Sequence, residues 1–347
     1  MNSRDLVKAT LEFDSPKKMP RDVWILPWAQ VHHPEQVKQV EQNFPNDIIK
    51  APTTCYKSIP KAVFDAYEPN GAAYSIGTFT DPWGCIFENR QRGVIGEVRE
   101  PLLQAWSEVD QVRIPEEFLN VDTDEVNGFC KRSEKFILGP SLAGGDLPRP
   151  FERLQFIRKT ENLYMDLVDQ PEEFSILLNR MHQFYIKVLE LWAKTGVDGL
   201  WFMDDWGSQN ALLVSPELWR KLFKPLYRDY VEIAHQAGKY MFFHSDGYIL
   251  DIFPDLIEVG VDAINSQIFC MGVENLGKQF AGQITFWGEI DRQYILPRGS
   301  AEEVVDAVKL VQDCLYRNGG VIAQCEFGAG PKPENVHLVF ETWDNIL

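Results

Sequence analysis

The second half of the chain contains side chains of the types that bind metal ions or move protons, each placed directly after a short apolar run. His244 and Asp246 follow the run KYMFF in the stretch HSDG. Residues two apart on a strand share one face, so both side chains can face one ion. Imidazole nitrogen and carboxylate oxygen are both ligands that zinc accepts. The pair is therefore a candidate site, and the alternative is a single histidine satisfied within the core.

Other apolar runs of the same region also end in polar residues. These endings are Asp204-Asp205, Ser266-Gln267, Glu289 with Asp291, and Cys325-Glu326. One such ending is unremarkable, but a succession of them is typical of a barrel whose parallel strands deliver their last residues to one mouth. We therefore expect these side chains to gather at the carboxyl ends of the strands.

Each of these residues also has a plainer interpretation. Adjacent strand residues point to opposite faces, so at most one of Asp204 and Asp205 faces the site, and we take Asp205. Glu289 could be a ligand, bind substrate or cap a turn, and we count it with Asp205 as a candidate catalytic residue. Cys325 is a ligand or a small buried hydrophobe, and its neighbour Glu326 weakens the second interpretation. Cys270 is a competing ligand, although packing explains it more simply.

Several tryptophans lie near the predicted strand ends. Most of them are expected in the core, but two or three could line a pocket for a flat substrate. The candidate substrate-binding residues are Trp28, Trp83, Trp206 and Gln267.

From about residue 135 onward, strand and helix patterns alternate with short connections. The strand runs include KFILGPS, GLWFMDD, KYMFFHSDG, DAINSQIF, ITFWGEID and VIAQCEFG. They are nearly continuous apolar runs, as expected when helices cover both faces of a parallel sheet. No GxGxxG motif opens a helix, which disfavours a doubly wound nucleotide-binding sheet. Aromatic, β-branched and glycine residues at 71–98 indicate hairpins. The predicted fold is α/β: one (β/α)8 TIM-like barrel domain over residues 1–347, with a hairpin-rich insertion toward its N-terminus.

The composition limits the partners. There are 51 acidic and 34 basic residues, a net charge of −17, which disfavours binding to a phosphate backbone. No run reaches the ~18 apolar residues that span a bilayer, and the N-terminus lacks the apolar core of a signal peptide. The six cysteines form no CxxC pair, so buried free thiols are expected. We expect a cytoplasmic protein that binds neither nucleic acid nor membrane.

Several stretches together resemble the uroporphyrinogen decarboxylase superfamily, which includes the decarboxylase and corrinoid-linked methyltransferases. They are TDPWG (80–84), DDWGSQ (204–209), SPELWRKLFKPLY (215–227), HSDG (244–247), the run from Asp255 to 265, FWGEID (286–291) and KPENV (332–336). The resemblance covers most of the chain and is strongest after residue 197. It implies the barrel fold and an active site at the carboxyl ends of the strands.

Decarboxylation of uroporphyrinogen is disfavoured within this family. The decarboxylase carries an arginine-rich motif, resembling RQAGR, after its first strand, and these arginines suit a substrate with many carboxylates. The corresponding stretch here, residues 27–33, reads PWAQVHH and contains no arginine. Asp81 of TDPWG is the position that resembles the decarboxylase's catalytic aspartate, so it is retained as a candidate catalytic residue.

The methyltransferase branch resembles this chain more closely. Its zinc sites use His-x-Cys after one strand and a cysteine after the last, which here correspond to His244, Asp246 and Cys325. Oxygen in place of one thiolate makes the metal a harder Lewis acid, suited to an ether or amine. The resemblance implies a zinc-dependent methyltransferase that acts on a small O- or N-methylated substrate with a corrinoid carried by a separate protein, with Glu289 as a possible fourth ligand. The alternatives are a metal-free decarboxylase using Asp81 and Asp205, and a non-catalytic barrel that binds a corrinoid or tetrapyrrole.

Overall fold

A computed structural model describes residues 1–58, 72–141 and 147–346. Eight parallel strands form a nearly closed barrel in the order β1-β11-β10-β9-β8-β7-β6-β2. Their bounds are β1 Arg21–Ile25, β2 Ile48–Lys50, β6 Phe136–Gly139, β7 Gly199–Met203, β8 Tyr240–Ser245, β9 Ala263–Ser266, β10 Thr285–Trp287 and β11 Val321–Phe327. The predicted barrel is confirmed, and no reversal of strand order interrupts it.

The barrel closes between β1 and β2 through side chains as well as backbone. The Asn46 amide accepts a hydrogen bond from the Val23 N–H at 2.7 Å and donates to the Val23 carbonyl at 3.1 Å. The Asp47 N–H donates to the Arg21 carbonyl at 2.8 Å. These bonds take the place of a regular ladder and satisfy the polar backbone groups along the seam.

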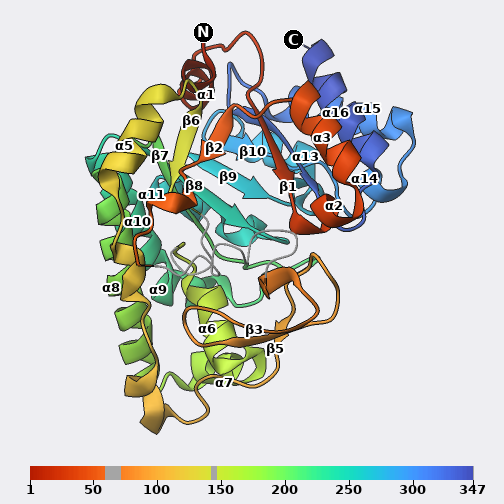
Figure 1. The fold of residues 1–347 in the computed structure, drawn as a ribbon. Helices are drawn as coiled ribbons and strands as arrows, with labels where there is room; N and C mark the ends of the chain where they lie inside the picture. Colours follow the sequence, from red (N-terminus) through yellow and green to blue (C-terminus); the bar gives the residue numbers. More distant parts are fainter. Residues whose placement is uncertain (59–71, 142–146, 347) are drawn as a thin grey trace.

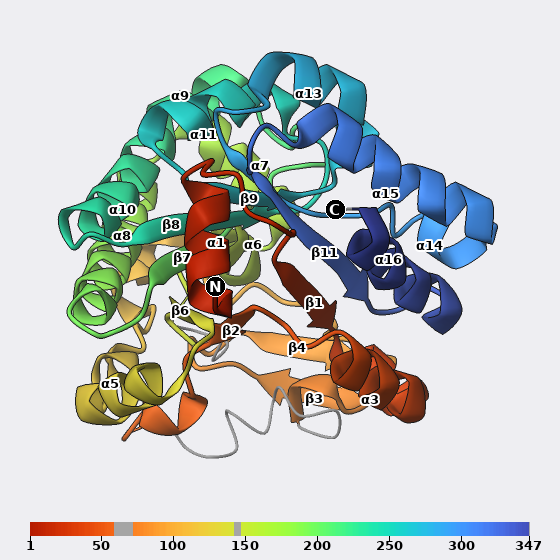
Figure 2. The same cartoon turned by 90° about the horizontal axis from the view of Figure 1, so that it is seen from above.

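Helices surround the strands (Figure 2). Their bounds are α1 Ser3–Leu11, α2 Pro27–His32, α3 Pro34–Asn43, α5 Thr123–Arg132, α6 Pro150–Arg158, α7 Thr160–Asp169, α8 Glu172–Ala193, α9 Pro216–Leu222, α10 Lys224–Gln236, α11 Phe253–Val259, α12 Ile268–Met271, α13 Val273–Phe280, α14 Ile295–Arg298, α15 Ala301–Leu315 and α16 Pro333–Ile346. Within the described ranges, none of these helices combines the length and apolarity that crossing a bilayer requires. Helix α1 covers the amino-terminal end of the barrel, where Val7 and Leu11 pack into the barrel interior. The open mouth therefore lies at the opposite end.

Alternation along the strands separates two hydrophobic clusters. On β11, Ile322 belongs to the cluster inside the barrel, whereas Val321, Ala323 and Cys325 belong to the cluster between the strands and the helices. This period of two decides which side chains can reach the mouth.

The predicted hairpin-rich insertion is confirmed for its described residues. Strands β3 Gly77–Thr80, β4 Ile86–Asn89 and β5 Glu97–Val98 form an antiparallel sheet. Together with α6 and α7, this sheet lies beyond the carboxyl ends of the barrel strands (Figure 1). The insertion thus stands on the side of the barrel where the candidate site residues emerge.

Candidate metal centre and adjoining pocket

Three side chains form a compact group at the carboxyl ends of two neighbouring strands. Asp205 follows β7, and His244 and Asp246 lie at the end of β8; their ligand atoms all lie within 4.8 Å of one another. The His244 Nε2 atom is 3.6 Å from Asp205 Oδ1 and 3.8 Å from Asp246 Oδ1. Two ligands about 2.0–2.2 Å from a tetrahedral ion lie roughly 3.3–3.6 Å apart. The two distances from His244 Nε2 therefore lie at or slightly beyond the range for ligands of one small divalent cation.

The orientation of His244 is fixed from β9. Its Nδ1 atom lies 2.6 Å from Asn265 Oδ1, and the Asn265 amide nitrogen donates to the carbonyl oxygen of Trp287. The amide oxygen therefore faces the imidazole, and Nδ1 is the protonated nitrogen that donates to it. The lone pair of Nε2 is then directed toward the two carboxylates, as metal-binding histidines require.

The two oxygens of Asp246 have different surroundings. Oδ2 forms an ion pair with Arg292 at 2.5 Å, whereas Oδ1 is buried and has no hydrogen-bond partner among the described residues. A buried carboxylate oxygen without a partner is costly unless a cation satisfies it. Burial, reinforced by the charge of Asp246, raises the pKa of Asp205 well above its usual range. Burial also opposes ionisation of Asp246, but electrostatic attraction to the neighbouring His244 and Arg292 side chains lowers its pKa. The donor set and the free oxygen together fit a divalent metal ion.

Arg292 connects this group to its surroundings, and sequence reasoning missed it. Its guanidinium binds Asp246 at 2.5 Å and Glu326 at 2.8 Å, and its Nε lies 3.6 Å from Glu289 Oε1. Burial raises the pKa of Glu289 well above its usual range, and Arg292 offsets only part of this effect. The sequence places Arg292 three residues after Glu289, which indicates a contact between these two residues. It does not indicate that Arg292 also binds Asp246 and Glu326.

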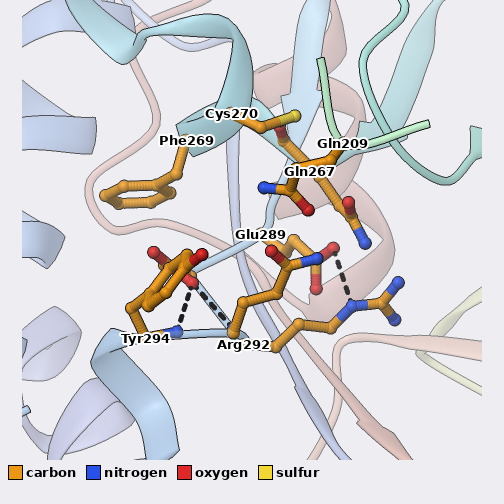
Figure 3. Close-up of a pocket in the computed structure, with 9 residues that line it drawn as sticks. Gln209, Gln267, Phe269, Cys270, Glu289, Arg292 and Tyr294 are labelled. Atoms are coloured by element: carbon orange, nitrogen blue, oxygen red, sulfur yellow. Dashed lines mark hydrogen bonds and ion pairs between the residues drawn. The ribbon is translucent and has the colours of Figure 1, made fainter. Parts of the chain in front are cut away.

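A pocket of ≈ 160 Å³ adjoins the group (Figure 3). It opens among the segments that follow β7, β9 and β10. Its walls combine two aromatic rings, three amides, two carboxyl groups, one guanidinium and one thiol: Gln209, Gln267, Phe269, Cys270, Glu289, Asp291, Arg292, Gln293 and Tyr294. Gln267 and Glu289 were both predicted site residues, and both lie in this wall.

The structure does not bring Cys325 into the compact group, so the expected set of His244, Asp246 and Cys325 is corrected. Cys325 is fully buried and belongs to the outer cluster that packs against the helices. Strand alternation turns Glu326 toward Arg292 at the mouth and Cys325 away from it. Among the described residues, Asp205 takes the place in the group that the cysteine was expected to fill.

The adjacent aspartates after β7 divide as the alternation rule requires. Asp205 faces the group, whereas Asp204 accepts hydrogen bonds from the Phe151 and Glu152 N–H groups at the start of α6 and from the Tyr227 hydroxyl. Asp204 therefore anchors the start of α6 to the barrel, and Asp205 faces the group.

Asp81, the expected catalytic aspartate, has a different setting. It is buried, its Oδ2 pairs with the buried Arg153, and its Oδ1 accepts hydrogen bonds from the Trp83 and Cys85 N–H groups at 3.0 and 2.8 Å. Both oxygens are thus engaged in holding the TDPWG turn against α6. Asp81 does not belong to the compact group and does not line the pocket described above.

Trp28, Trp83 and Trp206, the expected substrate-binding tryptophans, do not line the pocket described above. Trp83 is 1% exposed and packs edge to face against Phe184, and Trp206 is fully buried and stacked on Phe151. Trp28, on α2, lies beside His32 and His33. These rings fill space between elements, since large apolar groups are most stable there.

Lys50 is a second residue that sequence reasoning missed. Its ammonium lies over the indole rings of Trp201 at 3.8 Å and Trp287 at 4.8 Å, with no hydrogen-bond partner among the described residues. Burial lowers the pKa of Lys50 from 10.5 to about 8, although the charge of Asp22 opposes this change. No local sequence pattern indicates that Lys50 lies inside the barrel.

The fold and the group of ligands define the class: a (β/α)8 barrel with a candidate metal site at the carboxyl ends of its strands. The chain belongs to the uroporphyrinogen decarboxylase (URO-D) family, whose profile matches residues 7–346. A methyltransferase from Methanosarcina mazei has a similar structure, with a TM-score of 0.69 at 12% identity over 99% of each chain. The apo 3-keto-D-glucoside 4-epimerase YcjR from E. coli gives a TM-score of 0.38 at 14% identity, covering 66% of this chain and 86% of that one. Comparison with curated proteins gives no significant match.

Proposed function

We propose that this protein is a zinc-dependent methyltransferase that moves a methyl group between a small O- or N-methylated substrate and the corrinoid of a separate protein. The observation that carries the proposal is the group of Asp205, His244 and Asp246, with one buried Asp246 oxygen lacking a partner. Membership of the URO-D family supports the proposal, because corrinoid-linked methyltransferases belong to the same superfamily. The fold shared with the Methanosarcina methyltransferase also supports it.

The residues around the group have distinct roles in this proposal. Bound by these three side chains, zinc would act as a Lewis acid on the oxygen or nitrogen that carries the methyl group. Asn265 keeps the Nε2 lone pair of His244 free, and Arg292 holds Asp246 by one oxygen so that the other stays available. Three protein ligands leave an open coordination position, as catalytic zinc sites do.

Glu289 is the group placed to exchange a proton with the substrate. It lines the pocket, and burial raises its pKa, so its carboxyl takes up a proton more readily than that of an exposed glutamate. General acids work best when their pKa lies near the working pH. A heteroatom that loses its methyl group to the corrinoid retains the bonding electron pair and needs such a proton.

Metal analysis tests the proposal directly. Protein purified without chelator is expected to hold about one zinc per chain, and His244→Ala should lose most of it. The zinc-loaded protein should then methylate free cob(I)alamin from a panel of methyl ethers and methylamines. Protein that is folded yet neither retains nor binds added zinc would refute the proposal, as would turnover of uroporphyrinogen to coproporphyrinogen by the metal-free protein.

A further inference from the structure

Among the described residues that line the pocket, no positive charge is free to bind an anion. Arg292 is the cation in its wall, and its guanidinium already binds Asp246 at 2.5 Å and Glu326 at 2.8 Å. Its remaining nitrogen, Nε, faces Glu289 at 3.6 Å. A carboxylate or phosphate entering the pocket would therefore displace an existing ion pair instead of meeting a free donor.

Glu289, in contrast, favours a ligand that carries a positive charge. It is only 4% exposed, lines the pocket, and accepts no hydrogen bond at its carboxyl group from the described residues. Asp291 adds further negative charge, although its Oδ1 also accepts hydrogen bonds from the Gln293 and Tyr294 N–H groups. A buried carboxyl without a close donor gains most from a ligand that brings a positive charge or an N–H group.

The rest of the wall suits methyl groups on a cation. Phe269 and Tyr294 lie together at one end of the pocket, and Gln267 and Glu289 lie beside them (Figure 3). Aromatic faces attract methylated ammonium ions through their quadrupole, and side-chain oxygens contact the polarised methyl groups. The volume of ≈ 160 Å³ is similar to that of a cavity of about 150 Å³ known to hold benzene, so it admits a small ammonium ion.

We propose that this pocket recognises a small methylated ammonium ion, which makes methylated amines the substrate class of the proposed methyltransferase. The inference rests on that function. The Glu289 carboxylate is placed to take up the ammonium proton, which would leave a lone pair on the nitrogen for a bound Lewis acid. When the carbon–nitrogen bond breaks, the methyl group would pass to the corrinoid of the partner protein, and the bonding electron pair would stay on nitrogen. The proton then returns from Glu289 to that nitrogen, so atoms and charge balance.

The test compares two probes of equal shape that differ in charge: choline and its neutral isostere 3,3-dimethylbutan-1-ol. Isothermal titration of the zinc-loaded protein should show choline binding about 10-fold more tightly than the alcohol. Glu289→Gln keeps the shape of the side chain but removes its charge, and it should reduce that preference while leaving binding of the alcohol unchanged. Phe269→Leu should weaken choline binding selectively. Glu302→Gln, an exposed position on α15, is the control for loss of one negative charge and should behave as wild type.

The outcomes separate the two proposals. Equal binding of both probes, tighter binding of 4-methoxybenzoate than of choline, or no binding of any probe by zinc-loaded protein would each overturn the ammonium pocket while leaving the zinc methyltransferase intact. Absence of zinc binding would instead refute the function itself. Retention of the choline preference by Glu289→Gln would show that the carboxylate is not the recognition group and would also overturn the inference.

Discussion

Replacement of Asn265 by alanine should weaken metal binding, although Asn265 is not itself a proposed metal ligand. Asn265 is 1% exposed and accepts a hydrogen bond at 2.6 Å from His244 Nδ1, while its amide nitrogen donates to the Trp287 carbonyl. Removal of the side chain leaves the imidazole N–H without its acceptor and frees the ring to rotate or to adopt the other tautomer. Loss of such a supporting partner typically costs 10–100-fold in metal affinity, which corresponds to about 1.4–2.7 kcal/mol.

The assay is a competition titration of zinc against a chromophoric chelator at pH 7.5, with cobalt(II) substitution as a spectroscopic measure of ligand geometry. Ser266→Ala is the matched control because the next residue on β9 is equally buried and its hydroxyl has no hydrogen-bond partner among the described residues. Removal of that hydroxyl should leave zinc affinity unchanged. A circular dichroism melt checks that both variants are folded.

Zinc affinity of Asn265→Ala within about twofold of wild type would refute the reasoning, since the expected loss begins at roughly 10-fold. Equal losses in both variants would also refute it, because a general disturbance of β9 would then explain the effect. An altered cobalt(II) spectrum in Asn265→Ala alone would confirm that the asparagine orients the ligand.

Three further predictions follow from the same contacts. Cys325→Ala should retain the zinc content of wild type whereas Asp205→Ala loses most of it, and metal analysis showing the reverse would restore the cysteine as a ligand. The pKa of Lys50 in the folded protein is lowered from 10.5 to about 8, so between these pH values the unfolded chain binds a proton that the folded protein has lost. The stability of the wild type should therefore rise with pH across that window. Lys50→Met should abolish the rise and increase the free energy of unfolding by up to about 3 kcal/mol at pH 7, as measured by urea unfolding at each pH. Asp81→Ala removes one partner of the buried Asp81–Arg153 ion pair, so the free energy of unfolding should fall by about 3–5 kcal/mol, and an unchanged urea midpoint would contradict the assigned role.

Much of the architecture could be predicted from sequence because it depends on local patterns. Apolar strands alternating with amphipathic helices fix a parallel α/β fold, and the polar residue after each strand marks the carboxyl-end mouth. The same rule of alternation separated Asp204 from Asp205 and placed His244 and Asp246 on one face. These inferences needed only the period of two residues along a strand.

The ligand set itself depended on tertiary structure. The alternation rule gives the relative orientation of neighbours but not which face is inside, so Cys325 and Glu326 were equally plausible at the mouth until the packing of β11 was known. The roles of Arg292 and Lys50 arise from carboxylates and indoles brought by other strands, at separations that no local pattern encodes.

The sequence by itself determined the barrel, its insertion, the family and the end of the barrel that carries the chemistry. Only the tertiary structure decided that Asp205 joins His244 and Asp246, that Asp81 is committed to Arg153, and that the large tryptophans fill the core. The physical reason is that strand period and apolar burial are properties of short segments, whereas a metal site or ion pair depends on distances between segments that meet only when the barrel closes.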